Sequence, residues 1–162
     1  MPHLKFKSAK RMQAKATAAF NTHCRQITSL LPLAEIQHIG STAIPGALTK
    51  GDLDIVVRVA KPDFARAEKI LAANYSRNTK SLRDRSFSSF KNDNADPPVG
   101  IQLTVCGGKQ DHFIAFRDAM LADETLLSRY NQIKRQCAGS TMAAYQRKKS
   151  AFIEQVLTDV RH

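Results

Sequence analysis

Apolar residues recur along the chain with two different periods, and these periods predict both helices and strands. Spacings of three and four residues are typical of amphipathic helices, whereas alternation or a short apolar run between turn residues is typical of strands. We therefore expect helices over residues 8–30, 62–73, 111–122, 125–138 and 142–160, and strands over residues 35–39, 52–59, 86–90 and 101–106. This order predicts an α+β fold, a small mixed sheet flanked by helices, with a helical C-terminal third.

Length and composition favour one soluble domain over residues 1–162. Hydrophobic residues make up 43% of the chain and the mean hydropathy is -0.34. No stretch approaches the roughly 18 consecutive apolar residues of a membrane span. The basic N-terminus lacks the apolar centre of a secretory signal, so we expect a cytoplasmic protein without a membrane partner. The three cysteines are widely spaced and predict neither a disulfide framework nor a metal cluster.

The charge is strongly positive and unevenly distributed. The chain has 25 basic and 14 acidic residues, which gives a net charge of +11. The predicted basic N-terminal helix, residues 1–30, has no acid but six basic residues: Lys5, Lys7, Lys10, Arg11, Lys15 and Arg25. Two interpretations remain open, a docking surface for an anionic partner such as RNA and a solvated helix face.

The segment 39–57 combines residue types that suit phosphate chemistry. Gly40 allows backbone N–H groups to approach an anion closely, and Ser41 adds a hydroxyl at the same place. Asp52 and Asp54 alternate with apolar residues, so on a strand both carboxylates leave from one face. Two adjacent carboxylates suit a hard cation such as Mg²⁺, which usually completes its coordination with substrate phosphates. The alternative is a solvated outer face of the strand.

The same segment resembles the signature of the polymerase-beta-type nucleotidyltransferase superfamily: an apolar residue, Gly-Ser, a spacer, and Asp-apolar-Asp-apolar. The longer string HIGSTAIPG, with Lys50 and Asp54 behind it, is more similar still to the GrpB family of that superfamily. Further residues recur in GrpB order, so that the resemblance covers residues 35–157: Arg85 and Phe87, FRDAML from Phe116, Tyr130 with Lys134, and Tyr145 with Lys149.

The resemblance implies a nucleotidyltransferase-like fold and a set of site residues. Asp52 and Asp54 would be the catalytic residues and the ligands of Mg²⁺ or Mn²⁺. A nucleoside triphosphate or another phosphorylated small molecule would be bound by Gly40, Ser41, Thr42, Lys50 and Arg85. The pairs Tyr130 with Lys134 and Tyr145 with Lys149 have i,i+4 spacing on helices, and we expect them to serve in packing.

One position departs from active members of the superfamily, which place a third carboxylate on a later strand. Here that strand is predicted to be IQLTVC, which has Gln102 and Thr104 at the corresponding places. An amide and an alcohol lack the pKa of a general base at neutral pH. Three functions therefore remain: a metal-dependent nucleotidyltransferase acting on an unknown acceptor, a catalytically impaired binding module of the same fold, and, least favoured, an RNA-binding protein.

Overall fold

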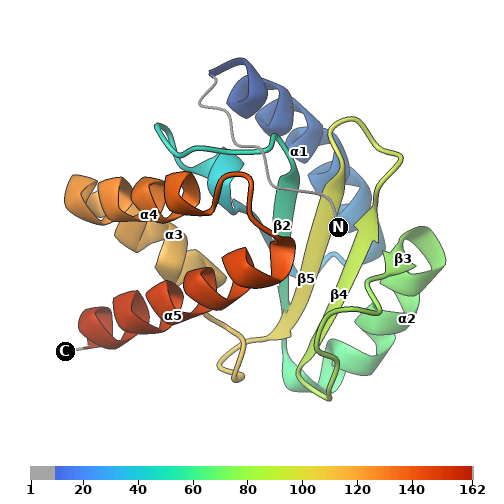
Figure 1. Ribbon diagram of the computed structural model, residues 1–162. Coiled ribbons are helices and arrows are strands. Elements are labelled where there is room, and N and C mark those ends of the chain that lie inside the picture. The colour runs from blue at the N-terminus through green and yellow to red at the C-terminus, as the bar shows by residue number, and fades with distance from the viewer. Residues whose placement is uncertain (1–9, 162) are drawn as a thin grey trace.

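The computed structural model describes residues 10–161 and contains one five-stranded sheet with five α-helices (Figure 1). In chain order, the helices and strands are α1 Lys10–Leu30, β1 Glu35–Ile39, η1 Ser41–Ala43, β2 Leu53–Val59, η2 Lys61–Asp63, α2 Phe64–Asn74, β3 Ser76–Arg77, β4 Phe87–Asn92, β5 Val99–Val105, α3 Phe113–Ala122, α4 Glu124–Cys137 and α5 Met142–Arg161; η marks a 3₁₀ helix.

The strand order is β1-β2-β5-β4-β3, and only β2 and β5 run parallel to each other. A parallel pair needs a crossover connection, which α2 provides together with β3 and β4. The register places Ile39, Asp54, Gly100 and Lys91 in one row across four strands. This row brings the turn after β1 next to Asp54 of β2.

Different helices cover the two faces of the sheet. Leu53, Ile55 and Val57 belong to the main core, which includes residues of α1 and α2. Because side chains alternate along a strand, Asp54, Val56 and Arg58 point to the opposite face. On that side α3, α4 and α5 lie together (Figure 1), and a second core joins them to the loop after η1. Asp54 therefore lies on the face of the sheet that the C-terminal helices cover.

The structure confirms the predicted fold class, a mixed sheet flanked by helices with a helical C-terminal third. The predicted strand over 35–39 matches β1, and the other predicted elements differ from the observed bounds by a few residues at most. Strand β3 was not predicted because it has only two residues, one exposed, and gives no alternation signal. Among the described residues, no helix is long and apolar enough to cross a membrane.

Candidate functional site

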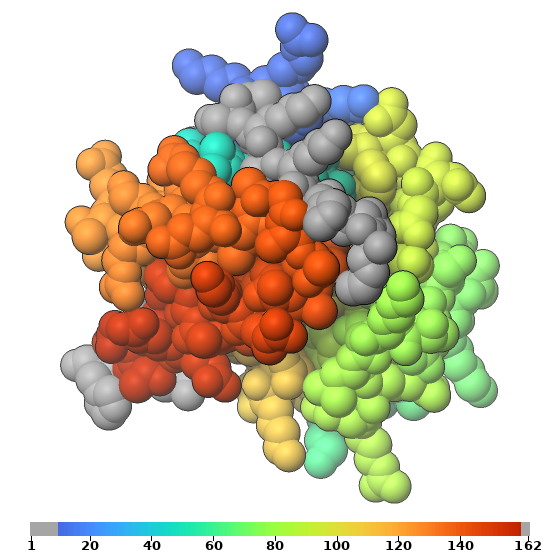
Figure 2. Space-filling model, viewed as in Figure 1, coloured from blue at the N-terminus to red at the C-terminus, as the bar shows by residue number. Residues whose placement is uncertain are grey.

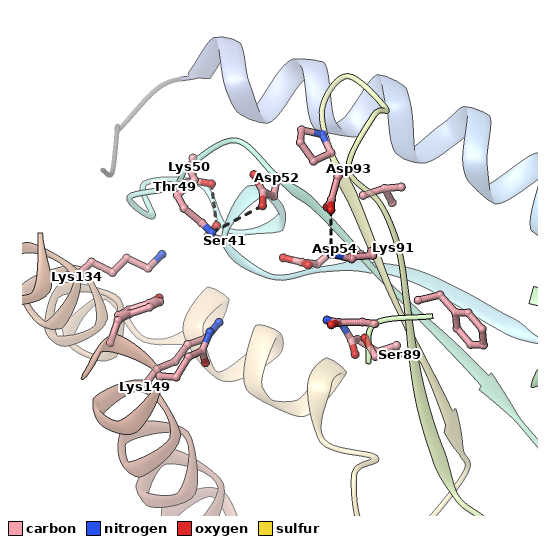
Figure 3. A pocket seen from close by; sticks show the side chains of 18 of the residues that line it. Ser41, Thr49, Lys50, Asp52, Asp54, Ser89, Lys91, Asp93, Lys134 and Lys149 are labelled. Atoms are coloured by element: carbon pink, nitrogen blue, oxygen red, sulfur yellow. Dashed lines mark hydrogen bonds and ion pairs between the residues drawn. The ribbon is translucent and has the colours of Figure 1, made fainter. Parts of the chain in front are cut away.

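A cavity of about 290 Å³ lies between the sheet and the α4–α5 pair (Figure 3). Asp52 and Asp54 line it on the side of β2, together with Ser41 and Lys50 from the preceding loop. Lys134 of α4 and Lys149 of α5 line the opposite side, and Figure 3 shows both lysines directed toward the two carboxylates. One wall is therefore acidic and the facing wall is basic.

The carboxylate of Asp54 fits between two residues that have no side chain. A Cβ atom at Gly40 would lie 2.5 Å from its Oδ2, and one at Gly100 would lie 3.1 Å from its Oδ1. Gly40 also has a φ of 78°, which side chains disfavour. Two requirements, backbone conformation and close approach, thus explain the glycine of the Gly-Ser turn. The β2–β5 register explains the second glycine, because it places Gly100 beside Asp54.

Burial makes the ionised form of Asp54 unfavourable. Loss of hydration is the largest cause, and it raises the pKa of Asp54 from 3.8 to about 6, while Lys149 opposes the rise and Asp52 adds to it. Asp52 is more exposed, and its Oδ2 lies 3.8 Å from Nζ of Lys50. A cation that binds between these carboxylates would therefore offset both the lost hydration of Asp54 and its repulsion by Asp52.

The hydroxyls of the Gly-Ser loop have different environments. Ser41 lines the cavity, and its hydroxyl donates to Oγ1 of Thr49 over 2.8 Å. Thr42 is buried, and its hydroxyl donates to the carbonyl oxygen of Asp52 over 3.1 Å while it contacts Nε2 of His38 at 2.9 Å. The hydroxyl of Thr42 therefore fixes the loop to the start of β2, and Ser41 presents the cavity-facing hydroxyl.

The basic wall is the main feature that sequence reasoning missed, because its lysines were expected only to pack. Tyr130 and Tyr145 are indeed buried, but they also line the cavity with Lys134 and Lys149. Nζ of Lys134 donates to the carbonyl oxygen of Leu48 and lies 4.0 Å from the centre of the Tyr130 ring. Burial, followed by repulsion from Lys149, lowers the pKa of Lys134 to about 7.

The loop between the Gly-Ser turn and Asp52 is held from both sides. Gln13 of α1 donates to the carbonyl oxygen of Ile44 over 2.6 Å. From α4, the amide of Asn131 donates to the carbonyl oxygen of Gly46 and accepts from the backbone N–H of Leu48, over 2.9 and 2.8 Å. The C-terminal helices thus fix the loop as well as supplying the basic wall.

Six of the predicted site residues come together, and Arg85 does not. The cavity is lined by Ser41, Lys50, Asp52 and Asp54. Gly40 lies against Asp54, and the hydroxyl of Thr42 holds the loop to the start of β2. Arg85 lies in a separate hollow beside α2, together with Arg83, Glu68 and Lys61. Of the predicted basic positions, Lys10, Arg11, Lys15 and Arg25 lie on or at the end of α1, whereas Lys5 and Lys7 are outside the described residues.

Asp93 also lines the cavity, but within residues 10–161 it does not complete a three-residue metal site with Asp52 and Asp54. No group of three His, Cys, Asp or Glu side chains there is arranged to hold a metal ion. Gln102 of β5 lines the cavity, while Thr104 is fully buried elsewhere. Nearby acids have other partners: Asp93 pairs with Lys91, Asp96 with Lys15, and Asp111 with Arg58.

Comparisons with known proteins identify the family and the fold of the chain. A UPF0157 protein of Vibrio cholerae is 35% identical over 96% of this chain and 82% of its own length. One from Streptomyces coelicolor is 30% identical over 75% of this chain and 65% of its own length. The crystal structure of conserved protein GrpB from Enterococcus faecalis matches 91% of this chain and 95% of its own, with a TM-score of 0.71 at 15% identity.

The Cid1 poly(U) polymerase, solved with Mg and 3'-dATP bound, has the same kind of fold. Its TM-score is 0.56 at 16% identity, over 80% of this chain but only 42% of the polymerase. This likeness shows a nucleotidyltransferase-like fold. The family model described as GrpB protein matches residues 10–159. The chain therefore belongs to the GrpB family and has a nucleotidyltransferase-like fold.

Proposed function

We propose that the cavity binds a nucleoside triphosphate together with Mg²⁺ or Mn²⁺. The proposal rests on one observation: two walls of opposite charge face each other across the cavity. Asp52 and Asp54 lie on one side, and Lys134 and Lys149 lie on the other. A metal–triphosphate complex has the matching pattern, a cation on one flank and phosphate oxygens on the other. Another phosphorylated small molecule with a comparable group would bind in the same way.

The acidic wall fits a hard divalent cation. Its donors are carboxylate oxygens, and the space between Gly40 and Gly100 holds one carboxylate in place without a competing side chain. Two protein ligands suit Mg²⁺, which commonly completes its octahedron with phosphate oxygens and water. When bound, the metal would neutralise phosphate charge and polarise the bond to the leaving group.

The residues of the chain itself would bind and orient the phosphates. Gly40 leaves room for the backbone of the turn, and Ser41 presents its hydroxyl beside it. Lys149 and Lys134 would neutralise the terminal phosphates from the helices. Lys50, which lies near Asp52, would exchange that contact for a phosphate oxygen. The volume of about 290 Å³ is near the lower limit for small-molecule sites, so one nucleotide fills the cavity.

We favour binding with slow or absent transfer, because Gln102 lines the cavity where a carboxylate would be needed and cannot serve as a general base. Nucleotidyl transfer to an acceptor is the second candidate, supported by the fold shared with Cid1 poly(U) polymerase. The two functions differ in turnover and share the same binding site.

A nucleotide and metal screen by thermal shift tests the binding. At about one hundred times its dissociation constant, a ligand should stabilise the protein by about 2.7 kcal/mol. The double variant Asp52→Asn, Asp54→Asn should lose the metal-dependent part. A matched control replaces two exposed acids outside the cavity, Asp63→Asn and Asp159→Asn, and should keep it. Equal metal-dependent shifts in both double variants would refute the site.

Pyrophosphate release tests the choice between binding and transfer. We expect the wild type to release pyrophosphate slowly or not at all, and Gln102→Asp to release it faster, because the new carboxylate would face the cavity beside β2. Gln102→Asn controls for the shorter side chain. Rapid release by the wild type would show that a carboxylate at this position is not required.

A further inference from the structure

The sheet side of the cavity continues past the acids onto the neighbouring strands. The register pairs Ser89 of β4 with Gln102 of β5, and the backbone N–H of Asn78, just after β3, donates to the carbonyl oxygen of Ser89 over 2.8 Å. All three residues line the cavity, and we call them the neutral patch, because their amides and hydroxyl form hydrogen bonds but carry no charge. The segment around β3 lies beside the first turns of α5 (Figure 2), and Gln146 of that helix lines the same cavity.

The neutral patch begins beside Asp54 and leads away from the basic wall. A Cβ atom at Gly100 would lie 3.1 Å from Oδ1 of Asp54 and 3.8 Å from Nε2 of Gln102, so only a small gap separates that amide from the carboxylate. Figure 3 shows Ser89 well separated from the two lysines of the basic wall, with Asp54 between them. A ligand that reaches from the lysines past a metal at Asp54 would therefore meet the patch next.

Two members of the patch have polar groups without a protein partner. Ser89 is only 2% exposed, and within residues 10–161 neither its hydroxyl nor the side-chain amide of Gln102 forms a hydrogen bond with another protein group. In the large majority of cases a buried polar side chain has such a partner. Because both groups line the cavity, their partners must come from what the cavity contains.

We propose that the neutral patch binds the nucleoside part of the ligand and thereby selects nucleotides over inorganic polyphosphates. This inference rests on the proposed function for the metal and the phosphates. The cavity of about 290 Å³ takes one nucleotide, so a ligand whose phosphates meet the Gly-Ser turn and the lysines must place its uncharged end elsewhere in the same space. The patch lies on the other side of Asp54 from that turn, since the strand order runs β1, β2, β5, β4.

The chemistry of the patch suits sugar hydroxyls and base edges. Both combine donors with acceptors, as do the amides of Asn78 and Gln102 and the hydroxyl of Ser89. A further phosphate would find little free positive charge on this side, because Lys91 of β4 pairs with Asp93 over 2.9 Å. The patch therefore complements the uncharged end of a nucleotide better than an additional phosphate.

Hydrogen bonds rather than stacking would hold the base. The aromatic residues that line the cavity, Phe90, Tyr130 and Tyr145, are all buried. Amides and hydroxyls offer both donors and acceptors to a base edge, so the patch should accept purine and pyrimidine nucleotides alike. ATP and UTP are therefore suitable probes.

Isothermal titration calorimetry with Mn²⁺ tests the patch by comparing ATP and UTP with inorganic tripolyphosphate. Tripolyphosphate has at least as much negative charge, so charge alone cannot favour the nucleotides. The test variant carries Ser89→Ala and Gln102→Leu, which remove both unpartnered groups without adding charge. The matched control, Gln37→Leu with Ser76→Ala, makes the same replacements on β1 and β3 of the same sheet, outside the cavity.

We expect the wild type to bind both nucleotides at least about tenfold more tightly than tripolyphosphate, because each neutral hydrogen bond changes affinity by about fivefold. The test variant should lose this preference and keep its affinity for tripolyphosphate, which also shows that it is folded, while the control keeps the preference. Ser89→Ala alone should lose about fivefold of ATP affinity and replaces the double variant if that variant does not fold.

Three results would overturn the proposal. The wild type would bind tripolyphosphate as tightly as the nucleotides, the test variant would keep the preference, or the control would lose it to the same extent. Failure of the proposed function looks different, because neither the nucleotides nor tripolyphosphate would then show metal-dependent binding.

Discussion

Replacing the buried acid of the cavity should stabilise the protein when no metal is present. In the folded state the pKa of Asp54 is about 6, well above the 3.8 of an unperturbed aspartate, and loss of hydration is the main cause. The folded state thus binds a proton more tightly than the unfolded state does. The contribution of Asp54 to the free energy of unfolding is fully present below pH 3.8 and is lost as the pH rises through about 6. Asp54→Asn removes that loss because its side chain stays neutral.

The expected gain follows from the size of the shift. Two pKa units correspond to about 2.7 kcal/mol, and solvent in the open cavity reduces this figure. We therefore expect Asp54→Asn to raise the free energy of unfolding by about 1 to 3 kcal/mol at pH 7.5, and by less than about 1 kcal/mol near pH 4. The shift already contains the attraction of Lys149, Lys50 and Lys134 and the repulsion of Asp52, so these groups need no separate correction.

Urea unfolding of both proteins in EDTA, at pH 7.5 and near pH 4, measures the difference. His38, whose pKa burial and Arg117 lower to about 4, also destabilises the fold as the pH falls, but this contribution is common to both proteins and cancels. Added Mg²⁺ or Mn²⁺ should then stabilise the wild type and leave the variant unchanged. A variant that is less stable than the wild type at pH 7.5 in EDTA would contradict the electrostatic description of the site.

Two further predictions concern the neighbours of the site. Gly100→Ala should change stability in EDTA by less than about 1 kcal/mol, because alanine loses less backbone entropy in a strand than glycine does and this offsets the crowding. Its Cβ would lie 3.1 Å from Oδ1 of Asp54, so the metal-dependent thermal shift should shrink. An unchanged shift would exclude Gly100 from positioning that carboxylate. Replacing Lys5, Lys7, Lys10 and Arg11 with Gln tests the basic N-terminal segment, residues 1–30, as an RNA surface. Filter binding should show a flatter salt dependence with nucleotide binding retained, whereas equal RNA affinity at low salt would show that these charges only face solvent.

The fold was predictable because its main elements have strong local patterns. The apolar run around Asp54 and the Gly-Ser turn before it lie in one short segment, so sequence reasoning could bring them together. The antiparallel β1–β2 register pairs Ile39 with Asp54, so the Gly-Ser turn and Asp54 are neighbours in the fold as well as in the sequence. Strand β5 was recognised from its alternation, and the resemblance to the superfamily left both Gln102 and Thr104 as candidates for the third-carboxylate position; the structure brings only Gln102 to the cavity.

The basic wall was not predictable in the same way because its function depends on tertiary packing. Tyr130 and Lys134 have the spacing of a packed helix face, and nothing local shows that the face lies opposite Asp54. Gly100 also carries no signal of its own, since its role appears only when β5 lies beside β2. Arg85 shows the reverse case: it belongs to the family pattern, yet it lies outside the cavity.

The arrangement also explains why one contact, between Gly40 and Asp54, depends on residues far away in sequence. The turn can approach the carboxylate this closely only while the loop that follows it stays in place, and that loop is held by Gln13 of α1 and Asn131 of α4. The same α4 contributes Lys134, which donates to the loop at Leu48 and faces Asp54 across the cavity. Loop position and cavity charge are therefore coupled through one helix. A ligand that draws Lys134 toward its phosphates would weaken the contact with Leu48, while the hydrogen bonds of Gln13 and Asn131 would still hold the loop.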